Sequence, residues 1–330
     1  MPDFFAGITY PGARALGLAS NQSVPTTQPL GYTVKKDGVV HIFLLRQKFL
    51  EMRNASLELV FVHELVHALQ YQHGLLTNNR TNFREAFPKW TTDAMVVSTA
   101  IIEGDAMMVT KRYQMKYGRN LSFPSYPRPI PIRGRWQHAL GLAPYYFGLQ
   151  FYQQLSIPLH KHNLLFTNPP NSSRGIVHPS AVDVLPALPS SLAQSGNLDN
   201  SFTAIRSDRI GEIVIRRALR VNEISSNVAT SAATGWVNGR MVYYEHTSDR
   251  VVVRWVTRWR SPTEANEFLT IWQRMLSLRG ARRVNGTVVM PATSTTPKTV
   301  YILEQNGANI TIVSGPSISL VRSFHNSHTT

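Results

Sequence analysis

The sequence predicts an α+β fold, and two patterns carry this prediction. In the first half, apolar residues recur at helical spacing over three long segments, 56–73, 92–117 and 135–155. In the second half, helical segments alternate with short β-prone runs, which are typical of antiparallel strands. A chain of 330 residues, 43% of them hydrophobic, has enough apolar material for one large or two moderate domains.

The N-terminal half begins with a small β element. The opening 30 residues are rich in Gly, Pro, Ser and Thr and are expected to form coil. A Lys-Asp-Gly turn then separates two β-prone runs within 32–44, which predicts a hairpin. The helices about 56–73 and 92–117 each end at a glycine, and both are apolar enough to be buried at the centre of a domain.

Prolines organise the middle of the chain. Four of them within 123–134 predict a loop before the aromatic helix 135–155. The stretch 157–200 is rich in Pro, Ser and Asn, which predicts a linker or a long wrapping loop. We therefore expect a mainly helical domain over 1–200 and an α+β domain with an antiparallel sheet over 201–330.

The second half supplies the sheet. Its tryptophans are expected to fill the core between sheet and helix rather than to form a platform for sugars or peptides. These are Trp236, Trp255, Trp259 and Trp272. The predicted elements are helices 210–221, 226–234 and 262–278, the last between the N-cap Ser261 and Gly280, and strands 240–246, 250–259, 287–290, 299–305 and 309–314.

The charge is strongly positive but dispersed. The 34 Lys and Arg against 19 Asp and Glu give a net charge of +15. The longest basic runs are doublets, which indicates a generally basic exterior and no specific nucleic-acid partner. A polyanion-binding protein is the less favoured alternative, which steep salt dependence of binding would support.

The absence of cysteine excludes disulfides, thiolate metal sites and a cysteine nucleophile, so any metal must be held by His and carboxylates. No apolar run reaches the roughly 18 residues of a membrane span. The first residues lack the pattern of a signal peptide, although the sequence leaves open whether a leader was removed.

Asn-x-Ser/Thr sequons favour an extracellular or cell-surface protein. The candidate N-glycan sites are Asn21, Asn54, Asn79, Asn120, Asn171, Asn285 and Asn309.

The most informative motif is His63-Glu64-Leu65-Val66-His67, an HExxH sequence within the first long helix. Four-residue spacing places both imidazoles on one helix face, close enough to share a Zn²⁺ ion, and Glu64 beside them can reach a coordinated water. Two histidines on a solvated helix face would be the plain alternative. The apolar flanks disfavour it, because a buried cluster of this kind needs partners.

Zinc of this type needs a third protein ligand. Glu103 is the favoured candidate, because it is a carboxylate within an otherwise apolar helical run. Asp105 is the rival, two positions away and so on another side of the helix. Asp93 at the start of that helix is expected to act as its N-cap or first-turn acid.

The zinc motif resembles that of the gluzincin metallopeptidases, in which HExxH is joined by a Glu from a later helix. More closely, His63 to Gly74 is similar to the HELxHALQDQHF signature of a group of surface metallopeptidases found in haloarchaea and some bacteria. The resemblance implies a zincin-like catalytic part and a zinc-dependent peptidase. Further matches are the EGDA element at 103–106, PYxxG at 144–148, PPxSSxxxxHP at 169–179, AxGW at 233–236 and a Trp followed by AxEF within 255–268.

The implied reaction is hydrolysis of a peptide or protein by a zinc-activated water, with Glu64 as general base. Tyr145, Tyr146 and His178 are candidates for the second donor to the oxyanion, although a core tyrosine or a loop histidine is the commoner role of such residues. The alternative function is a surface structural or adhesive protein that retains zinc without turnover. An intact Glu64 counts against this alternative.

The sequence departs from the resembled group at two places and from thermolysin-like enzymes at a third. Tyr71 stands where that group usually has Asp, so another residue must orient an imidazole; Gln70, Asp93 and Asp105 are candidates. Met107 stands where thermolysin-like enzymes have an Asp, and Val237-Asn238-Gly239 replaces Gly-Gly-Asp. Two other histidine pairs, His160 with His162 and His325 with His328, are expected to be solvated and without function.

Overall fold

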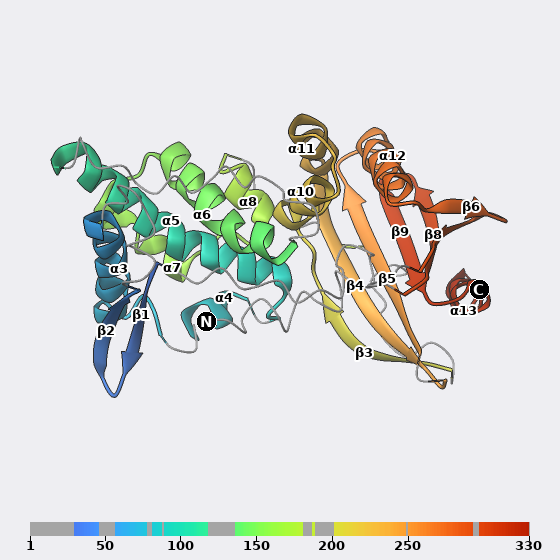
Figure 1. Ribbon diagram of the computed structural model, residues 1–330, viewed down its shortest axis with the longest axis horizontal. Coiled ribbons are helices and arrows are strands. Elements are labelled where there is room, and N and C mark those ends of the chain that lie inside the picture. Colours follow the sequence, from blue (N-terminus) through green and yellow to red (C-terminus); the bar gives the residue numbers. More distant parts are fainter. Residues whose placement is uncertain are drawn as a thin grey trace.

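The computed structural model describes residues 30–45, 57–77, 81–87, 89–117, 136–180, 187–188, 201–248, 250–292 and 297–329. As predicted, the fold is α+β. Figure 1 shows a helical part and a sheet part lying side by side, with the N-terminal hairpin at the far end of the helical part. In the part of the chain that the structure describes, no helix is both long and apolar enough to cross a membrane.

Three long helices and one hairpin build the helical part. Strands β1 (Gly31–Lys36) and β2 (Val39–Leu44) pair antiparallel and pack on α3 (Leu57–Gln72). Helix α3 packs in turn on α5 (Thr92–Tyr117), which lies against α6 (Trp136–Leu155). The predicted hairpin and all three predicted helices are therefore present.

Helices α5 and α6 approach each other backbone to backbone at a pair of glycines. A Cβ atom on Gly148 would lie 2.2 Å from the carbonyl oxygen of Ala100, and one on Gly104 would lie 2.5 Å from the carbonyl carbon of Gly148. Real side chains do not tolerate such distances. This contact gives a physical reason for the glycines of the EGDA and PYxxG elements, and it fixes the position of Glu103, the residue before Gly104 on α5.

The proline-rich stretch after α6 is more ordered than the loop expected from its composition. It forms a 3₁₀ turn (Leu159–Lys161) and the short helices α7 (Leu164–Thr167) and α8 (Ser173–Val177). Helix α8 packs on α5 and α6, and α7 packs on α5 and on α4 (Thr81–Ala86), a helix that the sequence did not predict. Up to residue 180 this stretch therefore wraps the helical part; most of 181–200 and the predicted loop 123–134 lie outside the described residues.

The second part is a seven-stranded antiparallel sheet in the order β3-β4-β5-β9-β8-β7-β6. Strand residues alternate between the two faces, so that Tyr243 joins the core on one side while Val242 and Tyr244 join the core on the other. Helix α12 covers the first face and α13 the second. The strands are β3 (Phe202–Asp208), β4 (Trp236–His246), β5 (Arg250–Trp259), β6 (Arg282–Val284), β7 (Thr287–Met290), β8 (Thr299–Asn306) and β9 (Asn309–Gly315), and the helices are α10 (Glu212–Val221), α11 (Ser226–Thr234), α12 (Pro262–Leu278) and α13 (Ile318–Thr329).

Most of these elements match the sequence prediction, and the tryptophans are core residues as expected. Trp236, Trp255, Trp259 and Trp272 are each at most 1% exposed. Ser261 caps α12 by accepting a hydrogen bond from the Glu264 amide. Strands β3 and β6 and helix α13 were not predicted, because their sequences are short or rich in charged and hydroxyl residues.

Helix α10 joins the two parts. It packs on α6, α8 and α5, and its apolar face belongs to the same continuous core as α5 and α6. The start of α5 is held by the end of β3, where the amide and hydroxyl of Thr92 donate to Asp208 at 2.7 and 2.6 Å. Arg209 follows with an ion pair to Asp93 at 3.1 Å. The parts divided at residue 200 in the sequence prediction thus share one core.

Candidate metal centre

Helix α3 presents His63, Glu64 and His67 on its inner face. These residues are buried, with 4%, 5% and 9% exposure. The sequence predicted that the whole helix would be buried, and this was wrong for its outer face. There Leu57, Phe61, Leu65 and Leu69 recur every fourth residue and are 39–51% exposed. The helix is buried only on the side that carries the motif.

Three ligand atoms converge between α3 and α5. The Nε2 atoms of His63 and His67 lie 3.1 Å apart, and Glu103 Oε2 lies 3.2 Å from the first and 3.3 Å from the second. Zinc binds such atoms at about 2.0–2.1 Å in a tetrahedron, which separates any two ligands by about 3.3–3.4 Å. The triangle is therefore the size that one zinc ion needs, and it leaves a fourth direction open. Among the described residues, this is the group of three that could hold a metal ion.

The electrostatics of the triangle follow from burial and proximity. Burial by itself lowers the pKa of His67, but the charge and hydrogen bond of Glu103, with Glu64 and Gln70 adding to them, raise it to about 9. Burial by itself raises the pKa of Glu103, and the neighbouring His67 and His63 instead bring it well below its ordinary value. These shifts favour a protonated His67 imidazole beside the ionised Glu103 carboxylate in the metal-free protein.

The carboxylate of Glu64 is oriented by β1. The Thr33 hydroxyl lies 2.7 Å from Glu64 Oε2, to which it donates, and 3.1 Å from the Glu64 carbonyl oxygen. Gly31 leaves room for the carboxylate, since a Cβ there would lie 3.0 Å from Glu64 Cγ. Within the described residues, no hydrogen bond is made to the other oxygen, Oε1. Nothing in the sequence marked Thr33, because it lies 31 residues earlier in an ordinary strand.

The imidazole of His67 begins a chain of buried hydrogen-bond partners. Its Nδ1 lies 2.9 Å from Gln70 Oε1, and Gln70 Nε2 donates to Asp105 at 2.8 Å. Asp105 Oδ1 lies 2.6 Å from Nδ1 of His162. Asp105 thus contacts Gln70 and His162 instead of joining the triangle. His162 is only 4% exposed, so the prediction that it is solvated was wrong.

The remaining candidates lie around this centre in different ways. The Tyr145 ring lies 6.1 Å from the His63 ring and nearly parallel to it. The Tyr146 hydroxyl accepts from Gln150 at 2.9 Å, and its ring faces the guanidinium of Arg217. His178 Nε2 lies 3.0 Å from Glu212 at the start of α10. Of the three candidate oxyanion donors, the structure places Tyr145 beside His63 and the other two in contacts with α6 and α10.

Other predicted residues lie away from the triangle. Asp93 is in the first turn of α5, as expected, and interacts with Arg209 and the Ser173 amide. His325 contacts Glu304. Of the sequons, Asn171 and Asn285 are exposed and Asn309 is partly buried, while Asn21, Asn54, Asn79 and Asn120 lie outside the described residues.

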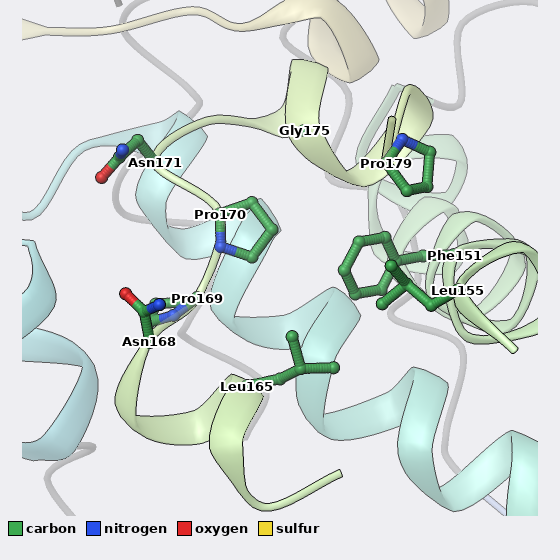
Figure 2. A pocket seen from close by; sticks show the side chains of 9 residues that line it. All are labelled: Phe151, Leu155, Leu165, Asn168, Pro169, Pro170, Asn171, Gly175 and Pro179. Atoms are coloured by element: carbon green, nitrogen blue, oxygen red, sulfur yellow. The ribbon is translucent and has the colours of Figure 1, made fainter. Parts of the chain in front are cut away.

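A separate pocket of about 280 Å³ lies between α6, α7 and α8. Figure 2 shows the rings of Pro170 and Pro179 facing Phe151 and Leu155 across it, with Leu165 below. None of the three triangle residues lines this pocket. The PPxSSxxxxHP segment therefore forms one wall of a pocket beside α6 that is lined by apolar side chains together with Asn168 and Asn171.

A family model described as a domain of unknown function (DUF8575) matches residues 200–325. The match covers less than half of the chain, namely the sheet part with α10, α11 and α12, and it leaves out the triangle on α3 and α5. No curated protein and no solved structure matches the chain.

Proposed function

We propose that this protein is a zinc-dependent metallopeptidase in which His63, His67 and Glu103 hold the metal. The observation that carries the proposal is the triangle of two imidazole nitrogens and one carboxylate oxygen, with sides of 3.1–3.3 Å. Two His and one Glu with an open fourth position form the ligand set of catalytic zinc peptidases. A zinc ion bound there supplies an acidified water and polarises a carbonyl group of the substrate.

Glu64 has the position and environment of a general base. It is the residue next to His63, and it is close enough to His67 to help raise the pKa of that imidazole. Thr33 holds one carboxylate oxygen, which leaves Oε1 to accept a proton from water and to pass it to the leaving amine. A site that only stabilised the fold would not need a carboxylate in this position.

Tyr145 is the candidate that best suits the second oxyanion donor, because its ring lies beside His63. We infer a peptide or protein as substrate and an extracellular or cell-surface location, on the strength of the sequons and the resemblance noted above. The net charge of +15 favours attraction of acidic substrates.

The proposal is tested by hydrolysis of a broad peptide library with the zinc-loaded wild type beside Glu64→Gln. A general base contributes about 10²–10⁴-fold to the rate, so the variant should bind zinc and cleave at least about a hundred-fold more slowly. New peptide ends are detected by mass spectrometry. Zinc bound by both proteins with cleavage by neither would contradict the peptidase and favour the structural surface protein.

A further inference from the structure

The chain of hydrogen bonds behind His67 has a direction that chemistry alone determines. Gln70 Nε2 lies 2.8 Å from Asp105 Oδ2 and 3.3 Å from the Ile102 carbonyl oxygen. A main-chain carbonyl can only accept a hydrogen bond, and an ionised carboxylate likewise. The end of the Gln70 amide that faces them must therefore be the nitrogen, and its oxygen must face His67.

The orientation of Gln70 in turn determines the tautomer of His67. An amide oxygen only accepts, so the imidazole atom 2.9 Å away, Nδ1, must carry the hydrogen. The lone pair of a neutral His67 is then on Nε2, which is the atom that points at His63 and Glu103. The reverse tautomer would turn a hydrogen toward the triangle and could not bind a metal.

His162 completes the chain from a different segment. Its Nδ1 lies 2.6 Å from Asp105 Oδ1, and its ring lies 4.5 Å from that of Tyr152 on α6. The residues His67, Gln70, Asp105 and His162 are all buried, at most 9% exposed, so water competes little for these hydrogen bonds. His162 donates a hydrogen bond to Oδ1 of Asp105, which keeps Oδ2 directed at Gln70.

We propose that Gln70, Asp105 and His162 form a positioning relay that holds His67 in the one tautomer and ring orientation able to bind the metal. This inference rests on the proposed metal centre and adds to it residues that never touch the ion. Partners of this kind typically change metal affinity by about 10–100-fold. The relay also gives the Gln of the HALQ sequence a specific role.

The first test compares the zinc dissociation constants of Gln70→Leu and Asp105→Asn with that of the wild type. We expect binding weaker by about 10–100-fold in both. The matched controls are Gln72→Leu, which is exposed on the same helix, and Asp93→Asn, a buried acid on α5 outside the relay. Both controls should keep the wild-type affinity, even though Asp93→Asn lowers stability.

A second readout reports the tautomer itself. In the zinc-loaded wild type, the Nδ1–H proton of His67 should appear in nitrogen-15 NMR spectra as a slowly exchanging signal, because Gln70 accepts its hydrogen bond. The signal should be lost in Gln70→Leu. A loss of packing alone would weaken binding without this specific change.

Exchange of donor and acceptor provides a rescue. In the double variant Gln70→Glu with Asp105→Asn, a carboxylate accepts from His67 and the new amide donates to it, so the links from His67 to position 105 are restored, while the Ile102 carbonyl loses its donor. We expect its zinc affinity to exceed that of Asp105→Asn at least several-fold, toward the wild-type value. An affinity no better than that of the single variants would overturn the relay, as would wild-type affinity with a protected Nδ1–H signal in Gln70→Leu. Absence of zinc binding by the wild type would instead refute the proposed function.

Discussion

At the residue scale, the atoms proposed to bind the metal are also the atoms that bind protons. In the metal-free protein Glu103 helps to raise the pKa of His67 to about 9. A raised histidine pKa stabilises the metal-free fold fully below about pH 6.5, and this contribution is lost as the pH rises through about 9. Metal binding requires the neutral imidazole, so the ion must displace that proton.

We therefore predict that zinc affinity increases by about tenfold for each pH unit between 7 and 8.5, with release of about one proton per ion bound. Competition titrations at several pH values give the affinity, and calorimetry in buffers of different ionisation enthalpy gives the number of protons. A zinc affinity that stays constant over this range would contradict the assigned protonation of His67.

A second residue, Arg217 on α10, is buried without a carboxylate. It is 6% exposed and lies over the rings of Tyr146 and Phe147, and no acidic side chain contacts it among the described residues. Burial is the largest of the causes that lower its pKa to about 10. Its neighbour Arg216 is also buried but pairs with Glu212. An uncompensated buried cation costs several kcal/mol.

Arg217→Met should therefore leave the free energy of unfolding unchanged or raise it by about 1–4 kcal/mol, because an apolar side chain of similar length replaces an unpaired charge. Arg216→Met is the matched control and should lower it by about 3 kcal/mol, since Glu212 loses a partner. Urea denaturation of both variants measures the difference. Destabilisation by Arg217→Met equal to that of the control would show that Arg217 is paired.

At the element scale, the contact between α5 and α6 determines where Glu103 and Tyr145 lie. Gly148 meets the α5 backbone, whereas Gly141 on the same helix has nothing within 4 Å of an added Cβ. The two glycines therefore differ in their effect on packing. One allows close packing, and the other only lowers the helix propensity of α6.

Gly148→Ala should lower the free energy of unfolding by about 1–3 kcal/mol or more, because the added methyl group meets main-chain atoms that cannot move aside. It should also weaken zinc binding by moving α6 and α5 apart. Gly141→Ala should raise stability by up to about 1 kcal/mol. Thermal unfolding of both variants checks the pair, and equal effects would contradict the backbone contact between α5 and α6.

Some helices and site residues could be predicted from the sequence and others could not. The bounds of α5 and α12 were predicted because apolar spacing and end signals agreed with each other, and Glu103 because a charge in an apolar helix needs a partner. Helix α13 was not predicted because its Ser, His and Asn residues have low helix propensity. It is stabilised instead by tertiary packing, in which Phe324 contacts the sheet. His162 could not be predicted, since its partner Asp105 lies 57 residues earlier.

At the scale of the whole molecule, the sheet part caps the helix that carries Glu103. Asp208 accepts two hydrogen bonds from Thr92 at the first turn of α5. A negative charge at this end of a helix also interacts favourably with the helix dipole. The shared core around α10 adds apolar contact. The two parts should therefore stabilise each other.

We predict one cooperative unfolding transition, with the same midpoint for tryptophan fluorescence, to which the sheet part contributes four of the six tryptophans, and for helical circular dichroism. Asp208→Ala should lower the free energy of unfolding by about 1–3 kcal/mol. Glu245→Ala, an exposed acid on β4, is the control and should change it by less than about 0.5 kcal/mol. Two separate transitions in the wild type would show that the parts fold independently.

The zinc content at equilibrium tests whether His63, His67 and Glu103 hold one metal ion. After dialysis against buffered zinc, the wild type should contain about one zinc per chain. Glu103→Gln should bind more than about a hundred-fold more weakly, beyond what loss of a ligand's hydrogen-bond partner costs. A wild type without zinc, or equal zinc in both proteins, would contradict the proposed metal centre.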